Sequence, residues 1–332
     1  MRTFFAAVLL SLAALPALAE TPRKPDDASN TMGKHVPTDK STILRVQIYL
    51  DQELFPPGKI DGALGEFSYK AVVNWNYSHG RTDLYDWEAV VKNALSKVPV
   101  AEASYTIRED HLPFINPKLP EQPEHWQEFK EMSYRSMLEL VAERFHTDET
   151  FLEKLNPGKD LSRLKPGDVI QVPSVRPFKI EQVKHYQAFK NDPDLSTHTV
   201  VIDTVERMGA VYDADEHMLA AFPITPGKPQ FIPTGIWKIM NMATTPEFRY
   251  DKKFLEEGQR GTDDTAYKVP PGPNSPVGIL WAGLSKSGIG LHGTANPRTI
   301  GRAQSAGCVR FANWDAIRLP TLVRPGSTVI VK

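Results

Sequence analysis

Cys308 is the single cysteine of this 332-residue chain, and it follows His292 by a short stretch of sequence. The thiolate is the nucleophilic form of cysteine, and a histidine can take the thiol proton and later return it to a leaving amine. We therefore take Cys308 as the candidate nucleophile and His292 as the candidate base. The alternative is an inert structural thiol, since free cysteine is among the most buried residue types.

The residues around this pair suggest how a substrate would be held. Gly293 and Gly307 would let the backbone pass close beneath a substrate, because neither has a side chain. Backbone N–H groups near Gly307 and Cys308 are candidates to stabilise an oxyanion, an effect worth roughly 3 kcal/mol per donor. Arg310 is the candidate for a bidentate carboxylate clamp. We expect the other cations of this stretch to be surface residues: Arg298, Arg302, Arg318, Arg324 and Lys332.

No cofactor is predicted. The other histidines lack the spacing of metal ligands, and neither GxGxxG nor GxxxxGKS occurs in the sequence. With 39 basic and 40 acidic residues the net charge is −1, so no global charge points to nucleic acid.

The elements that must position the pair are mostly strands. From about Thr197 to Lys332, short apolar segments alternate with Gly and Pro, among them 199–203, 209–212, 219–224 and 327–331. This spacing favours a sandwich or mixed sheet over a parallel α/β fold. Phe248, Tyr250 and Tyr267 lie in a polar stretch that we interpret as a lid, with ordinary loop anchoring as the alternative.

Five motifs occur in a fixed order in this region: 232–237, 271–278, Leu291-His292-Gly293-Thr294, Ser305-Ala306-Gly307-Cys308-Val309-Arg310, and 326–329. Together they resemble the L,D-transpeptidase catalytic domain of the YkuD type. The resemblance implies that Cys308, His292 and Gly293 are catalytic, with the Gly293 carbonyl holding the imidazole. It further implies that Ser305, Ala306, Gly307 and Arg310 contact substrate. Many members have histidine at the position of Ala306, a departure that bears on thiol acidity or acceptor choice.

Two modules are predicted ahead of this domain. Residues 41–97 carry two helical patterns around Pro56-Pro57-Gly58-Lys59-Ile60-Asp61-Gly62 and resemble a peptidoglycan-binding domain, a generic helical hairpin being the alternative. Residues 98–125 are proline-rich and are interpreted as a linker. Residues 126–178 resemble a LysM module through a helix, helix, strand order, although its usual opening strand is not matched near Tyr134-Arg135-Ser136-Met137. The predicted fold class is thus multidomain α+β, with a mainly β, sandwich-like catalytic domain at 195–332 after two small helical and LysM-like modules.

The amino terminus predicts export. Residues 1–19 have a basic start, an apolar run and small residues before Glu20, which is typical of a cleaved signal peptide. The apolar run is shorter than the roughly 20 residues of a transmembrane anchor, and residues 20–40 read as a flexible leader. Because thiols of exported proteins usually pair, an unpaired Cys308 is a candidate reactive thiol.

The resemblance implies an exported, periplasmic or cell-wall-associated enzyme. Cys308 would attack the carbonyl of the third residue of a peptidoglycan stem, expel D-alanine and pass the acyl group to an amine, and carbapenems would acylate the thiol. Two alternatives keep the acyl-enzyme: water as acceptor, giving an L,D-carboxypeptidase, or a lysine of an envelope protein. A third is a non-catalytic wall-binding protein.

Overall fold

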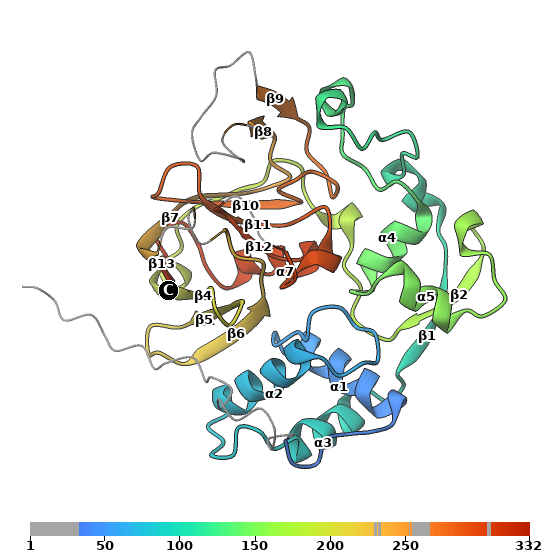
Figure 1. The fold of residues 1–332 in the computed structure, drawn as a ribbon, viewed down its shortest axis with the longest axis vertical. Helices are drawn as coiled ribbons and strands as arrows, with labels where there is room; N and C mark the ends of the chain where they lie inside the picture. Colours follow the sequence, from blue (N-terminus) through green and yellow to red (C-terminus); the bar gives the residue numbers. More distant parts are fainter. Residues whose placement is uncertain (1–32, 229–230, 232–233, 252, 254–265, 304–306) are drawn as a thin grey trace, which may run out of the picture.

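The computed structural model describes residues 33–228, 231, 234–251, 253, 266–303 and 307–332 (Figure 1). The predicted signal peptide, most of the leader, and Ser305 and Ala306 therefore lie outside the described residues. None of the described helices is long and apolar enough to cross a membrane.

The first part is a three-helix module formed by α1 (Lys40–Gln52), α2 (Glu66–Ser78) and α3 (Glu88–Lys97). The apolar pattern predicted for the first helix is confirmed, because Leu44, Ile48 and Leu50 are buried. The N-cap is Asp39, whose carboxylate accepts from Thr42 N at 2.8 Å.

The middle part, here called the βααβ module, comprises β1 (Glu102–Thr106), α4 (Met137–Arg144), α5 (Glu149–Leu155) and β2 (Val169–Pro173). β1 pairs antiparallel with β2. β1 therefore lies inside residues 98–125, which were interpreted as a linker. β1 was missed because it is short and none of its residues is buried, so its weak alternation of exposed and half-buried residues carries little signal.

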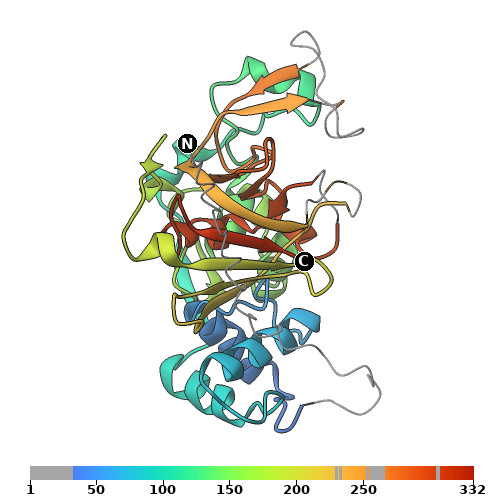
Figure 2. The ribbon, with the colours of Figure 1, turned by 90° about the vertical axis from the view of Figure 1, so that its left-hand side faces the viewer.

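Residues 107–136, here called the arm, separate β1 from α4. The arm contains two short 3-10 helices, η1 (Glu109–Phe114) and η2 (Pro123–Glu128). Its end is fixed to the C-terminal domain, because Met132 N donates to Pro271 O at 2.7 Å and Asn274 N donates to Met132 O at 2.8 Å. Figure 2 shows the arm beside the hairpin of β8 (Phe248–Asp251) and β9 (Ala266–Val269).

The C-terminal domain is built on one curled, mixed sheet, which has nine strands within the described residues. The strand order is β12-β11-β10-β7-β13-β4-β5-β6, and β3 also pairs with β7. The β13–β4 and β11–β12 pairs are parallel, and the others are antiparallel. A single sheet replaces the sandwich-like arrangement that was expected. Its strands are β3 (Ala188–Phe189), β4 (Thr199–Asp203), β5 (Met208–Tyr212), β6 (Met218–Pro223), β7 (Gly235–Thr244), β10 (Leu280–Leu284), β11 (Gly290–His292), β12 (Val309–Arg310) and β13 (Thr328–Val331).

Both faces of the sheet are covered at β5, which explains why this strand is buried at every position. Met208, Ala210 and Tyr212 of β5 join an apolar cluster with the three-helix and βααβ modules, whereas Val211 joins a second cluster within the C-terminal domain. The second cluster also includes residues of α7 (Asn313–Ala316) and η8 (Leu319–Thr321). The remaining short 3-10 elements are η3 (Leu161–Arg163), η4 (Ile180–Gln182), η5 (Leu195–Thr197) and η7 (Pro297–Thr299).

Candidate active site

Strand pairing brings the predicted catalytic residues together. β11 and β12 are parallel, and their register places His292 opposite Arg310 and Leu291 opposite Val309. Phe311 N extends the ladder by donating to His292 O at 2.8 Å. Cys308 immediately precedes β12 and lies two residues before Arg310, so both side chains point to the same face of this short strand pair, with His292 opposite Arg310.

His292 is held in the tautomer that a base requires. Its Nδ1 lies 2.6 Å from the carbonyl oxygen of Gly293, and a carbonyl only accepts, so Nδ1 carries the proton and Nε2 keeps its lone pair. The Trp281 ring stacks on the imidazole at 5.6 Å between centroids and an interplanar angle of 21°. Burial, assisted by the nearby Arg310 charge, lowers the pKa of His292 to about 3, so the imidazole is neutral in the resting site.

Cys308 is also uncharged at neutral pH. Burial raises the pKa of its thiol to about 11, against the opposing effects of a Gly290 backbone hydrogen bond and of Arg310. The residue is nonetheless partly exposed, and Sγ lies 3.6 Å from the Gly288 carbonyl oxygen. The resting pair is therefore a neutral thiol and a neutral imidazole, and the proton must move as the sulfur attacks.

Cys308, His292 and Arg310 line one cavity of about 610 Å³. Two of the three predicted lid aromatics, Phe248 and Tyr250, also line it. Tyr267 does not, but its ring stacks on Tyr250 at 6.3 Å.

The arm completes the cavity with Trp126 and Arg135, which sequence reasoning did not connect with the site. Trp126 meets Tyr250 edge to face at 5.8 Å. A small apolar cluster of Leu119, Met132 and Val269 joins the arm to the β8–β9 hairpin. No local pattern in the sequence signals such a wall, because it depends on how two distant segments pack.

Residues 197–331 match the L,D-transpeptidase catalytic domain, YkuD. Among relatives, the YkuD protein of Bacillus licheniformis is 27% identical over 194 residues, covering 58% of this chain and 92% of the relative. YkuD of Bacillus subtilis is 35% identical over 99 residues, covering 30% of this chain and 51% of the relative, so the chain spans about half of that protein.

Solved structures with likeness to the chain include L,D-transpeptidase 3 of Mycobacterium tuberculosis. It is 16% identical, with 51% of this chain and 76% of that chain covered, at a TM-score of 0.33. An Enterococcus faecium L,D-transpeptidase is 18% identical, with 40% and 49% covered, at a TM-score of 0.30. TM-scores this low show no shared fold for the whole chain, so the match of residues 197–331 to the YkuD domain is the informative comparison.

A buried network supports the histidine loop of the YkuD domain from behind. The side-chain oxygen of Asn313, on α7, accepts from Thr294 N and Ile279 N, both at 3.2 Å. Its Nδ2 donates to Glu143 Oε1, on α4, at 2.9 Å. The second carboxyl oxygen of Glu143 accepts from the Tyr134 hydroxyl. The βααβ module thus reaches the backbone that follows His292.

Both predicted glycines occupy positions where a side chain would not fit the local structure. A Cβ at Gly293 would lie 2.2 Å from Asn313 Oδ1, so this glycine makes room for the network. Gly307 has a φ of +114°, a conformation in which side chains are strained. Ser305 and Ala306 lie outside the described residues.

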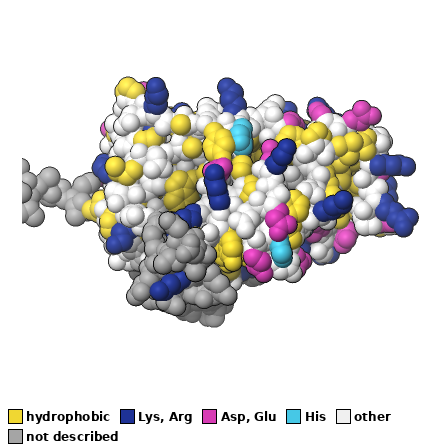
Figure 3. All heavy atoms as spheres, turned by 90° about the horizontal axis from the view of Figure 1, so that it is seen from above, with side chains coloured by type: hydrophobic (Ala, Val, Ile, Leu, Met, Phe, Trp, Pro, Cys, Tyr) yellow, Lys and Arg dark blue, Asp and Glu magenta, His cyan; other side chains and the backbone are white. Residues whose placement is uncertain are grey.

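Most of the C-terminal cations bind partners elsewhere. Arg298 pairs with Glu149, Arg318 with Asp51 and Asp315, and Lys332 with Asp203. Arg324 lies over the Phe189 ring, and Arg302 is exposed. In Figure 3, the face seen from above the view of Figure 1 has Lys and Arg dispersed among acidic and apolar side chains, with no single basic patch.

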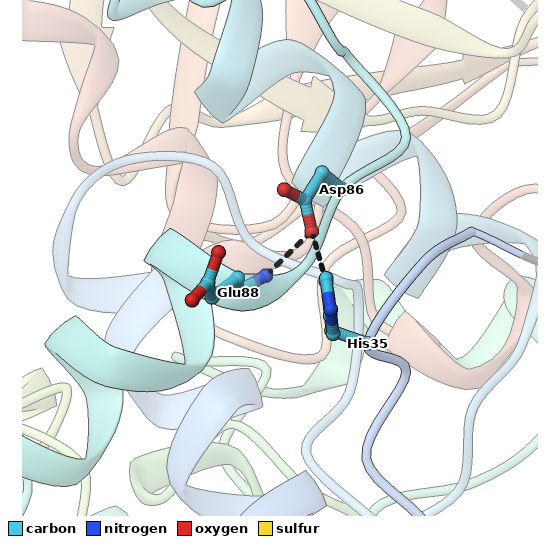
Figure 4. Close-up of side chains that lie close together, drawn as sticks. All are labelled: His35, Asp86 and Glu88. Atoms are coloured by element: carbon cyan, nitrogen blue, oxygen red, sulfur yellow. Dashed lines mark hydrogen bonds and ion pairs between the residues drawn. The ribbon is translucent and has the colours of Figure 1, made fainter.

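One group of side chains away from the cavity has the composition of a cation site. Ligand atoms of His35, Asp86 and Glu88 lie within 4.8 Å of one another (Figure 4). However, Asp86 Oδ1 bonds His35 Nδ1 at 2.9 Å and accepts from Glu88 N at 3.0 Å. Asp86 therefore binds the backbone at the start of α3, and these two hydrogen bonds explain why the three side chains lie close together without an ion.

Proposed function

We propose that this protein is an exported peptidoglycan L,D-transpeptidase. The observation that carries the proposal is one cavity, within a YkuD match, that brings together the Cys308 thiol and a His292 whose Nδ1–H bond to Gly293 leaves Nε2 free as a base. The neutral resting pair suits general-base activation of the thiol during attack.

The first half-reaction forms a thioester. Cys308 Sγ adds to the carbonyl carbon of the third stem residue while His292 Nε2 takes the thiol proton. The carbon–nitrogen bond to the terminal D-alanine then breaks, and the imidazolium returns that proton to the leaving amine. In the second half-reaction an acceptor amine attacks the thioester, the carbon–sulfur bond breaks, and the proton shed by the amine returns to the sulfur.

The modules ahead of the YkuD domain are proposed to serve the same substrate. The β1–α4–α5–β2 order supports the LysM-like module predicted at 126–178, with β1 added as a strand that precedes those bounds. The three helices suit the peptidoglycan-binding domain predicted at 41–97. With the predicted signal peptide, such modules support a location in the periplasm or at the cell wall.

The test uses purified mature chain with a disaccharide-tetrapeptide. The wild type is expected to release D-alanine and form dimers cross-linked between third residues, and Cys308→Ala is expected to do neither. A carbapenem should add its mass to the wild type and not to Cys308→Ala, as read by intact mass. If the wild type formed tripeptide monomers without dimers, its reaction would be a carboxypeptidation and not a transpeptidation. Full activity of Cys308→Ala would overturn the proposal.

A further inference from the structure

Arg135 is the one basic residue that the arm contributes to the catalytic cavity. Its backbone is fixed on both sides. Tyr134 N donates to Phe114 O at 3.0 Å, and Ser136 is the N-cap of α4. The carboxylate of Glu139 accepts from Arg135 N itself. The position from which the side chain enters the cavity wall is therefore set by the fold of the βααβ module.

The guanidinium of Arg135 has few protein partners. One terminal nitrogen makes a long contact of 3.4 Å with Pro120 O. Nε is buried and has no hydrogen-bond partner within the described part of the chain. Arg310 in the same cavity wall shows the same feature, since its Nε is also buried and unpartnered among the described residues. A buried donor without an acceptor is costly, which points to a ligand that supplies one.

The acidic residues of the cavity do not neutralise this pair. Glu247 forms its ion pair with Lys268 at 2.7 Å, and Asp251 is engaged in an interaction of its own. Within the described residues, neither Arg135 nor Arg310 forms an ion pair. Arg249, the third arginine of the cavity wall, is engaged in an interaction of its own. The guanidinium groups of Arg135 and Arg310 in this partly enclosed cavity repel each other, and a ligand with two carboxylates would relieve that repulsion.

We propose that Arg135 is a second carboxylate-binding residue of the active site, supplied by the βααβ module, and that the donor peptide is recognised through two carboxylates at once. This inference rests on the proposed function. Arg310, two residues from Cys308, takes the terminal carboxylate beside the scissile bond. Arg135 takes the side-chain carboxylate of the third stem residue, so the preferred donor has a diaminodicarboxylic acid there with that carboxyl group free.

The experiment compares two tetrapeptide donors, one with the free side-chain carboxylate and one in which it is amidated. The wild type is expected to release D-alanine faster from the free acid. Arg135→Gln should lower kcat/KM for the free acid about tenfold to a hundredfold, the range of one charge-assisted hydrogen-bonding site, and leave the amidated donor unchanged. Arg135→Lys should restore part of the preference. The matched control is Arg163→Gln on the same module, where the side chain is 87% exposed, and it should leave both rates unchanged.

Labelling of Cys308 by iodoacetamide, an uncharged reagent, reports whether Arg135→Gln keeps the cavity folded, and its rate should equal that of the wild type. Equal losses on both donors would assign Arg135 a structural role and overturn the inference, as would no loss on either. A wild type that releases D-alanine from neither donor would overturn the proposed function, and the inference with it.

Discussion

At the scale of single residues, the site is defined by two groups that burial keeps uncharged. His292 and Cys308 have pKa values displaced in opposite directions, to about 3 and about 11. A preformed thiolate–imidazolium pair would need the reverse order, with the imidazole more basic than the thiol. These pKa values therefore indicate that the Cys308 thiol loses its proton only when a substrate carbonyl is in place. Between turnovers the thiol stays protonated and reacts slowly with other electrophiles.

This assignment predicts a steep pH dependence for alkylation of Cys308. With a thiol pKa of about 11, about one molecule in ten thousand is thiolate at pH 7, so the iodoacetamide rate should rise about tenfold per pH unit from 7 to 10. Intact mass against time gives the rate. A cysteine peptide in the same buffers is the control, and its rate should level off above its ordinary pKa of about 8.5. A plateau for the protein beginning near pH 6 would show an ion pair and contradict the assignment.

At the scale of elements, α4 of the βααβ module supports α7 and the histidine loop. Glu143→Ala removes the acceptor of the Tyr134 hydroxyl and leaves Asn313 Nδ2 with the Pro273 carbonyl oxygen, at 3.2 Å, as its one acceptor among the described residues. We expect a loss of about 1–3 kcal/mol in the free energy of unfolding, with a fall in D-alanine release because Asn313 also binds Thr294 N. Denaturant unfolding and product release check both effects. Glu153→Ala on the exposed side of α5 is the control, and a Glu143→Ala variant that behaved like it would remove the network from the mechanism.

The raised pKa of Glu143 also predicts how the free energy of unfolding depends on pH. Burial, aided by Glu139, raises its pKa to about 8 although hydrogen bonds from Tyr134 and Asn313 act against this. Between about pH 4.5 and 8 the folded state keeps a proton on Glu143 that the unfolded state releases. The contribution of this carboxyl group to the free energy of unfolding is therefore complete below pH 4.5 and is lost as the pH rises towards 8. Glu143→Gln, which is neutral throughout, should show a smaller decrease in Tm between pH 5 and 8 than the wild type. Parallel Tm curves for the two proteins would contradict the assignment.

The elements that the sequence predicted are those whose own residues carry the signal. β4 and β13 are apolar runs bounded by turns, and α1 and α2 have buried residues at helical spacing, so all four were predictable. β1 has no buried residue, and its identity as a strand depends on β2.

The same reasoning explains what was and was not predictable in the site. Cys308, His292 and Arg310 are recognisable by residue type and order. Trp126, Arg135 and Glu143 belong to the site only because the βααβ module packs against the YkuD domain, and no local pattern carries that information.

At the scale of the whole molecule, the predicted modules behave as one folded body. A single apolar cluster contains Leu44 of α1, Leu140 of α4, Ala210 of β5 and Trp314 of α7. Where the three parts meet, fully buried Asp51 accepts from Arg318 at 2.6 Å and from His146 Nδ1 at 3.0 Å, and the His146 ring stacks on Trp314 at 5.3 Å. Arg318 and His146 hold the pKa of the Asp51 carboxyl below its ordinary value despite its burial. The active-site wall supplied by the arm is consequently tied to the stability of this junction.

Removing Asp51 tests whether the molecule unfolds as this single body. Asp51→Ala leaves the buried Arg318 with Asp315 as its one remaining carboxylate partner among the described residues. Breaking a buried pair in this way costs about 3–5 kcal/mol, or roughly 4–7 °C in Tm for a chain of this size. Asp83→Ala, which breaks the exposed pair with Lys34, should lower the Tm far less than Asp51→Ala does. Because the modules share a core, we expect one calorimetric transition in each variant, with D-alanine release lost at the same temperature. Two separated transitions in Asp51→Ala, with activity following the upper one, would mean that the YkuD domain is stable without the junction and that the arm is dispensable to its cavity.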